Sequence, residues 1–150
     1  MNMIDLEEIK KRILKGEEIE NILKDFGWRD FEDFVAEIFS LNNFITKRRV
    51  RFKTSKRYEI DIVAEKDNFV LCIDCKKWRR GRYKEYGLKK AAEKQKERCE
   101  NLKNFLNDKR KYFPLVVTLY EENISKHNSV IFVPVWKLNE VLNRFEVYFL

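Results

Sequence analysis

The stretch YEIDIVAEKDNFVLCIDCKKW, residues 58–78, decides the fold, because it is the densest apolar part of a chain otherwise crowded with charge. Both halves read as strands, and the KDN between them reads as a tight hairpin turn. If the hairpin closes through a two-residue loop, so that Lys66 faces Phe69, then Asp61 falls directly opposite Asp74. The stretch therefore carries ionisable side chains where a fold usually buries Ile, Val and Leu.

This register gathers charge on one side of the hairpin. The period of two places Asp61, Val63, Cys72, Asp74 and Lys76 on one face and Ile60, Ile62, Leu71, Ile73 and Cys75 on the other. Facing carboxylates repel each other, so a cation between or beside them would stabilise the pair. Lys76 offsets part of the charge, and a divalent ion that takes oxygen ligands, such as Mg²⁺, offsets more. An ion pair that closes a strand end, or two exposed acids at a fraying edge, is the alternative, and a one-residue slip would set Asp61 against Cys75.

The rest of the chain reads as a mixed α/β domain with helices packed on a central sheet. Residues 1–27 are expected to form an N-terminal helical extension, with helices at 4–14 and 17–25 broken near Gly16, and residues 28–150 the main domain. The expected elements of that domain are a helix from Asp30, as N-cap, to Leu41, strands at 44–52, 58–65 and 69–78, a helix at 83–107, strands at 112–120 and 129–136, a helix at 137–145 and an apolar tail, EVYFL.

Two helices carry a polar side chain beside their apolar stripe. The first places Phe31, Phe34, Val35, Ile38 and Phe39 on one side. Glu32 borders that side while Glu37 lies towards solvent, so Glu32 is the better candidate to reach inward. In the long helix, Gln95 completes a stripe formed by Leu88, Ala92, Cys99, Leu102 and Leu106. A buried glutamine needs a hydrogen-bond partner, which is either a backbone group or the carboxylate cluster.

Length and composition describe one folded domain rather than a membrane or disulfide-rich protein. The chain has 150 residues, of which 44% are hydrophobic and 38% charged. No apolar run reaches the roughly 18 residues of a membrane span, and the start lacks the apolar core of a signal peptide. We therefore expect a cytoplasmic, nucleoid-associated protein. Cys72 and Cys75 spell C-x-x-C but point to opposite faces of a strand, which predicts buried thiols rather than a redox pair.

Positive charge gathers beside the hairpin. Because the chain carries +7 and residues 1–33 carry −4, from ten acids and six bases, the remainder carries +11. Residues 47–57 include seven bases and no acid, and residues 76–90 include eight bases against Glu85. Such clusters, interleaved with aromatic residues, suit a phosphate backbone, although two solvated surfaces give the same pattern. The predicted DNA-binding residues are Lys47, Arg48, Arg49, Arg51, Lys53, Lys56, Arg57, Lys77, Arg79, Arg80, Arg82 and Lys84.

The hairpin acids and lysine form a recognisable motif. Asp61, a spacer of twelve residues and then Asp74-Cys75-Lys76 resemble the D-x(n)-(D/E)-x-K motif of PD-(D/E)xK, restriction-endonuclease-like nucleases. Within that superfamily, DFEDFVAEIFSLNNF and EIDIVAEKDNFVLCIDCKKW are similar to Mrr-type restriction endonucleases and archaeal Holliday-junction resolvases. The resemblance covers residues 28–108.

Details around the motif both match and depart from those families. Glu32 stands twelve residues before Phe44, as a helix acid precedes a Gly-aromatic pair there, and Asn43 replaces the glycine. Ile60 stands where the superfamily name has Pro. The second acid is Asp74 rather than the commoner Glu, and its shorter reach would shift a bound metal slightly.

The resemblance implies a fold, a reaction and a set of site residues. The fold is the α-β-β-β-α-β-β restriction-endonuclease-like core, and the reaction is Mg²⁺-dependent hydrolysis of DNA phosphodiester bonds, with Mn²⁺ as the alternative ion. Lys76 would orient the attacking water and stabilise charge that grows on the phosphate, and Gln95 would position Lys76 or that water. The implied metal ligands are Asp61, Asp74, the carbonyl of Cys75 and Glu32.

Other interpretations stay open. The same fold can serve as a catalytically inactive DNA-binding or protein-docking module, and the basic charge also permits an RNA-processing nuclease. No separate recognition domain is visible, which favours structure-selective or non-specific cutting over base-specific restriction. Junction resolution would need a homodimer. The N-terminal extension and the VYFL end are candidate interfaces, although a polar-faced helix and a buried terminal strand explain them as well.

Overall fold

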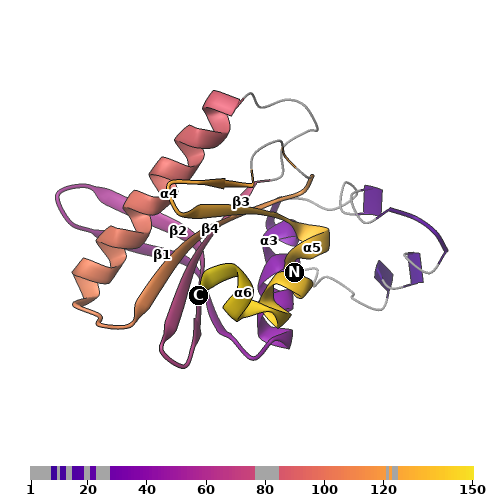
Figure 1. Cartoon of the computed structure of the whole chain (residues 1–150), viewed down its shortest axis with the longest axis horizontal. Coiled ribbons are helices and arrows are strands. Elements are labelled where there is room, and N and C mark those ends of the chain that lie inside the picture. Colours follow the sequence, from indigo (N-terminus) through magenta and orange to yellow (C-terminus); the bar gives the residue numbers. More distant parts are fainter. Residues whose placement is uncertain are drawn as a thin grey trace.

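The computed structural model describes residues 28–76, 85–120 and 125–150, the short pieces 8–9, 11–12, 15–18 and 21–22, and residue 122 (Figure 1). Its main elements are α3 (Trp28–Leu41), β1 (Ile45–Lys53), β2 (Arg57–Lys66), β3 (Phe69–Lys76), α4 (Glu85–Leu106), β4 (Lys111–Thr118), β5 (Lys126–His127), β6 (Val130–Pro134), α5 (Val135–Asn143) and α6 (Phe145–Phe149). Every helix and strand predicted within residues 28–150 is present, and β5 and α6 are additional.

Six strands form one mixed sheet in the order β1-β2-β3-β4-β6-β5. The first three strands are antiparallel neighbours, whereas β4 lies parallel to both β3 and β6. A parallel neighbour requires a crossover connection, and α4 lies in the one between β3 and β4. The mixed α/β fold with a central sheet, predicted from the order of periodic segments, is confirmed.

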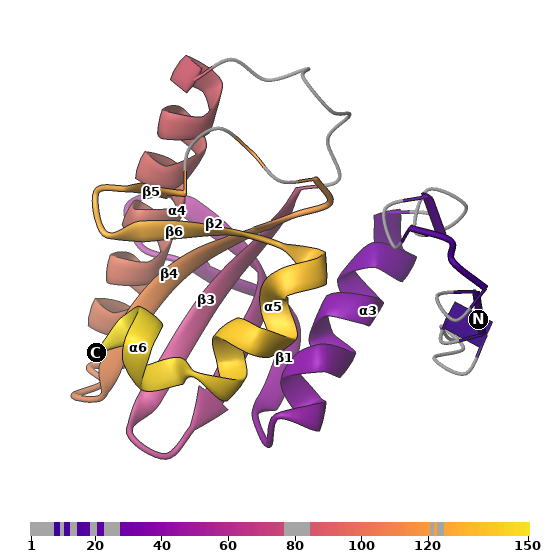
Figure 2. The same cartoon turned by 45° about the vertical axis from the view of Figure 1, so that its right-hand side comes forward.

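Helices cover both faces of this sheet. Figures 1 and 2 show α4 across one face, and α3 and α5 against the other. The core on the side of α3 and α5 includes Ile73 and Cys75, and the core on the side of α4 includes Cys72 and Cys99. Cys72 and Cys75 therefore point to opposite faces, as predicted, and both are buried free thiols.

The hairpin of β2 and β3 has the predicted register. Ile62 pairs with Ile73 and Lys66 with Phe69, so the loop contains two residues. In that loop Asp67 has a φ of 54°, a left-handed conformation that tight hairpin loops require and that aspartate tolerates. The turn and the apolar pattern therefore agree on one pairing.

One side chain of the hairpin lies on the face opposite to the prediction. Ile60 packs with Cys72 on the side of α4, whereas Ile62 packs on the side of α3. The cause lies in β1, where Arg49 has a φ of 48° and where the Arg49–Asp61 rung is missing from the β1–β2 ladder. The ribbon turns over at this rung, so the two-residue period that places Ile62 does not extend to Ile60.

Two element boundaries also differ from the prediction. Helix α3 begins at Trp28, so Asp30 lies in its first turn rather than at its N-cap, a position where a negative charge is favourable. The strand expected at 129–136 ends at Pro134, and α5 begins at Val135. Proline has no N–H for a further ladder bond, and its fixed φ suits the start of a helix.

The apolar C-terminal tail is helical, so the alternative of a buried terminal strand is wrong. In α6, Phe145 stacks on Phe149 with ring centres 4.7 Å apart, and both rings contact Phe113 of β4. A short helix brings these two rings to the same side because they are four residues apart. Val147 and Leu150 remain exposed on the outside.

The N-terminal extension is described only in part. Residues 8–9, 11–12 and 21–22 are helical, and Gly16 has a φ of 89° in a turn where the two expected helices are separated. The other residues of 1–27 lie outside the described ranges. Among the helices that the structure describes, none has the length and apolar character needed to cross a membrane.

Candidate active site

The two hairpin acids converge where β2 and β3 stop pairing. The β2–β3 ladder ends at Ile62 and Ile73, one rung before Asp61 and Asp74. Beyond that end, the backbone N–H of Cys75 donates to Oδ2 of Asp61 at 2.9 Å. This hydrogen bond fixes the Asp61 carboxylate against β3. Asp74 directly precedes Cys75 in that strand.

Both acids and Lys76 line one open cavity of about 440 Å³. The structure thus confirms that two carboxylates and an ammonium gather at one end of one face of the hairpin. The other lining residues come from the end of the β1–β2 ribbon and from α4, and they are Lys56, Arg57, Tyr58, Glu59, Lys94, Glu97 and Arg98. The cavity therefore lies between the ribbon and α4, with the acids at the end of the ladder.

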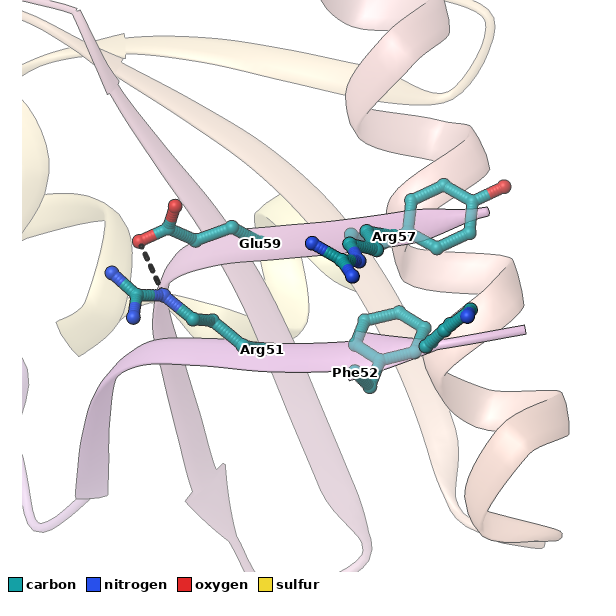
Figure 3. Close-up of a pocket in the computed structure, with 6 residues that line it drawn as sticks. Arg51, Phe52, Arg57 and Glu59 are labelled. Atoms are coloured by element: carbon teal, nitrogen blue, oxygen red, sulfur yellow. Dashed lines mark ion pairs between the residues drawn. The ribbon is translucent and has the colours of Figure 1, made fainter. Parts of the chain in front are cut away.

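A neighbouring hollow on the β1–β2 ribbon has a different character (Figure 3). It is lined by Arg51, Phe52, Lys53, Arg57, Tyr58 and Glu59. Its acid, Glu59, lies 3.5 Å from Nε of Arg51, and Phe52 stacks on Tyr58 with ring centres 5.1 Å apart. An ion pair and a packed ring pair account for this lining, so the cavity with Asp61 and Asp74 is the better candidate site.

Asp74 lies in surroundings that disfavour its charged form. Its side chain is almost fully buried, and Nζ of Lys76 lies 3.3 Å from its Oδ2. Burial raises the pKa of the Asp74 carboxyl to about 7; the Lys76 ammonium opposes this shift and the Asp61 carboxylate adds to it. Near neutral pH, a second cation beside Asp74 would therefore favour the ionised carboxylate.

The donor atoms suit a hard divalent cation. Oδ2 of Asp74 is buried and accepts no hydrogen bond from the described residues; Nζ of Lys76 lies 3.3 Å from it, and a divalent cation would add a further partner. Asp61 adds a second carboxylate, and oxygen ligands of this kind are the ones that Mg²⁺ takes. Within the described ranges no three His, Cys, Asp or Glu side chains are arranged to hold a metal. Among the described residues, Asp61 and Asp74 are the two side chains of this cavity that we consider as ligands, and a backbone oxygen, water or substrate could take further positions.

Glu32 reaches inward from α3, as predicted, while Glu37 is exposed. Its side chain is buried, and Nε of Arg49 lies 3.9 Å from its Oε1. Burial raises the pKa of the Cys75 thiol, and the negative charges of Asp61, Asp74 and Glu32 raise it further. Glu32 thus lies close enough to Cys75 to act on it electrostatically, but it does not line the cavity, and its role as a ligand stays a prediction.

Gln95 is fully buried and both ends of its amide are bound. Nε2 donates to the carbonyl of Cys72 at 2.9 Å, and Oε1 accepts from Nη1 of Arg98 at 3.1 Å. Of the two open alternatives, the backbone partner is the one found, and the other end holds Arg98 rather than Lys76. Sequence reasoning missed Arg98, although its place three residues after Gln95 puts it on the same side of the helix.

Most of the basic side chains in residues 47–57 lie close to an acidic side chain. Five of the seven bases form ion pairs, which are Lys47 with Glu65, Arg48 with Asp33, Arg49 with Glu32, Arg51 with Glu59 and Lys56 with Glu97. Only Lys53 and Arg57 have no ion pair with a described residue. Five of these bases therefore have an acid within ion-pair distance, and DNA binding by residues 47–57 stays a prediction. Lys77, Arg79, Arg80, Arg82 and Lys84 lie outside the described ranges.

Comparison with known proteins gives one family and one curated relative. The family model Mrr_cat, described as a restriction endonuclease, matches residues 23–110. An uncharacterised protein of Archaeoglobus fulgidus is 39% identical over 122 residues, which make up 81% of this chain and 93% of that protein.

Solved structures give weaker similarities. The protein of unknown function AF1548 matches with a TM-score of 0.47 and 20% identity, over 75% of this chain and 54% of that one, so the chain spans about half of its length. The small subunit of the heterodimeric restriction endonuclease R.BspD6I matches with a TM-score of 0.44 and 14% identity, over 81% of this chain and 80% of the subunit.

Proposed function

Because the chain belongs to the restriction-endonuclease family of the Mrr_cat model, we propose that it is a metal-dependent endodeoxyribonuclease that hydrolyses DNA phosphodiester bonds. The observation that carries the proposal is the meeting of Asp61, Asp74 and Lys76 in one cavity, where Oδ2 of Asp74 is buried and lies 3.3 Å from Nζ of Lys76. A role in repair, recombination or restriction fits this activity, with structure-selective or non-specific cutting.

Asp61 and Asp74 are the side chains that would hold the metal, with Mg²⁺ as the first choice and Mn²⁺ as the alternative. When bound, such an ion supplies Lewis-acid chemistry, which polarises a phosphate and makes water more acidic. The hydrogen bond from Cys75 N–H keeps the Asp61 carboxylate oriented, so little reorganisation is needed on binding. The Cys75 carbonyl and Glu32 are the further ligands that we propose.

Lys76 supplies a positive charge two residues after Asp74, at the end of β3. Its side chain is partly buried, so its ammonium acts in a medium that screens charge less than water does. In the proposed reaction it donates to the attacking water or to a phosphate oxygen and stabilises the negative charge that grows there. The ion pair of Lys76 with Asp74 would weaken if a metal ion offset the charge of that carboxylate.

A cleavage assay with Lys76→Ala tests the proposal. We expect wild type to cut supercoiled, linear or four-way-junction DNA in Mg²⁺, and the variant to cut at least about a hundredfold more slowly with DNA binding nearly unchanged. Lys109→Ala, an exposed change outside the cavity, is the matched control and should cut like wild type. Cleavage by Lys76→Ala at the wild-type rate would remove this assignment.

A catalytically inactive DNA-binding or docking module is the second candidate. It is favoured by the ion pair of Lys76 with Asp74, which already offsets part of the negative charge at the two acids. The same assay separates the candidates, because a binder would retard all three DNA substrates and cut none. An added RNA substrate tests the processing-nuclease alternative, and analytical ultracentrifugation tests the homodimer that junction resolution needs.

A further inference from the structure

We propose that the DNA backbone crosses this cavity between α4 and the β1–β2 ribbon, where Arg98 binds the phosphate held at the two acids and Arg57 and Lys94 bind neighbouring phosphates. The inference rests on the proposed function and adds the path of its substrate. The expected DNA contacts are then not the basic side chains of β1, which form ion pairs, but three of the cations that line the cavity.

Arg98 is held in place by a buried amide. Gln95 uses its Nε2 on the Cys72 carbonyl of β3, at 2.9 Å, and its Oε1 on Nη1 of Arg98, at 3.1 Å. A carbonyl only accepts and a guanidinium only donates, so the amide has one orientation that satisfies both partners. The sheet thereby fixes Arg98 at the cavity wall, which limits the side-chain entropy that a phosphate contact would cost.

Arg98 forms no ion pair with a described residue, although its charge opposes the rise in the pKa of Asp74 and lowers the pKa of Glu97. No carboxylate of the described residues lies within ion-pair distance of its guanidinium, whereas Lys56 in the same cavity lies 2.9 Å from Glu97. A guanidinium carries five N–H donors, and Gln95 engages one of its nitrogens. The remaining donors are available to a phosphate, whose oxygens match this fork of N–H groups in a bidentate contact.

Two further cations continue the path, one on each wall. Arg57 begins β2 and Lys94 lies on α4; both are exposed, line the cavity and have no ion pair with a described residue. In contrast, Lys47, Arg48 and Arg51 of β1 each face an acid. Of the five cations that line this cavity, Arg57, Lys94 and Arg98 are therefore the ones without an ion pair to a described residue.

The ribbon and α4 contact each other beside the cavity. Besides the Lys56–Glu97 ion pair, the ring of Phe52 lies 5.4 Å from that of Phe105, on the last turn of α4. These contacts tie the end of the ribbon to α4, and Lys56 and Glu97 themselves form part of the cavity wall.

Equilibrium binding to a fluorescein-labelled 20-base-pair duplex tests the path. Measured by anisotropy in Ca²⁺ over a salt series, Arg98→Ala should weaken binding about tenfold and lower the slope of log Kd against log salt by about one. The pair Arg57→Ala with Lys94→Ala should lower the slope by about two. Arg98→Lys keeps the charge but not the fork, so it should recover the slope more than the affinity.

The controls separate this inference from the proposed function. Lys109→Ala should bind like wild type, and equal thermal unfolding temperatures exclude misfolding of the Arg98 variants. Unchanged affinity in Arg98→Ala, a larger loss in Lys47→Ala or Arg51→Ala, or no binding by wild type would overturn the path. If wild type does not cut DNA in Mg²⁺ but the variants lose binding as expected, the proposed nuclease activity would be wrong. The proposed path of the DNA would still hold.

Discussion

Asp74 is buried, and it lines a cavity in which a cation could bind. In water an aspartate is ionised above about pH 4, but the pKa of this carboxyl is raised to about 7, with burial as the first cause. A group that holds its proton more tightly in the folded state makes that state less stable as pH rises. Without metal, the site is therefore a weak point of the fold at neutral pH.

The first prediction concerns this acid. In EDTA, the free energy of unfolding of wild type should fall as pH rises from about 4 to about 7, by up to about 4 kcal/mol, because the unfolded chain loses the proton first. Asp74→Asn cannot ionise, so its stability should vary much less over that range and exceed that of wild type at pH 8. Urea unfolding at each pH measures both, and parallel curves would show that Asp74 does not titrate this way.

At the residue scale, the sequence predicts the acids and Lys76 but not Arg98. Asp61 and Asp74 converge because two strands of known period and a two-residue loop leave one register, and all of that information is local. Arg98 lies on a helix whose rotation against the sheet depends on tertiary packing. Its partner Gln95 was singled out, yet the choice between a backbone group and the acids required coordinates.

The turnover of the β1–β2 ribbon is a feature of elements rather than of single residues. On either side of the missing Arg49–Asp61 rung the two strands keep the same register, but they present opposite faces to α4. The turnover lets Ile60 join the core beside α4 and leaves Asp61 outside the ladder, where its carboxylate meets Cys75 N–H. The site therefore depends on a left-handed residue one strand away.

The second prediction tests that dependence. Because Arg49 has a φ of 48°, a β-branched replacement is strained there, and Arg49→Gly should be more stable than Arg49→Val by about 1–3 kcal/mol. Arg51, two residues along the same strand, is a matched control without positive φ, so Arg51→Val should equal or exceed Arg51→Gly by about 1 kcal/mol. Urea unfolding of the four variants would contradict the turnover if position 49 also preferred valine.

The whole molecule can be predicted from its sequence to the level of element order and sheet type. Each of the predicted strands and helices has a clear local period, and a long helix between strands implies the parallel crossover. The ion pairs of residues 47–57 could not be predicted, because the partners Asp33, Glu65 and Glu97 lie on other elements. The helical tail also escaped prediction, since its form depends on contacts of Phe145 and Phe149 with β4.

The third prediction concerns metal binding by the intact fold. A ligand that binds only the folded state at about a hundred times its Kd adds about 2.7 kcal/mol, which should raise the unfolding temperature by about 5–10 °C. We expect this shift from Mg²⁺ at pH 8 and a smaller one at pH 6, because protons compete for Asp74. Asp61→Asn should lose the shift, whereas Glu59→Gln, which changes another acid of the same cavity, should keep it. Equal shifts in both variants would place the metal elsewhere.

The most direct test of the central claim, that the carboxylate pair holds the ion for DNA hydrolysis, is the initial rate of supercoiled-plasmid nicking as a function of Mg²⁺ concentration. For wild type the rate should rise to a plateau with Mg²⁺ and vanish in EDTA. For Asp74→Asn it should stay at least about a hundredfold lower at every concentration, although this variant folds at least as stably. Nicking by Asp74→Asn at the wild-type rate, or by wild type in EDTA, would contradict the claim.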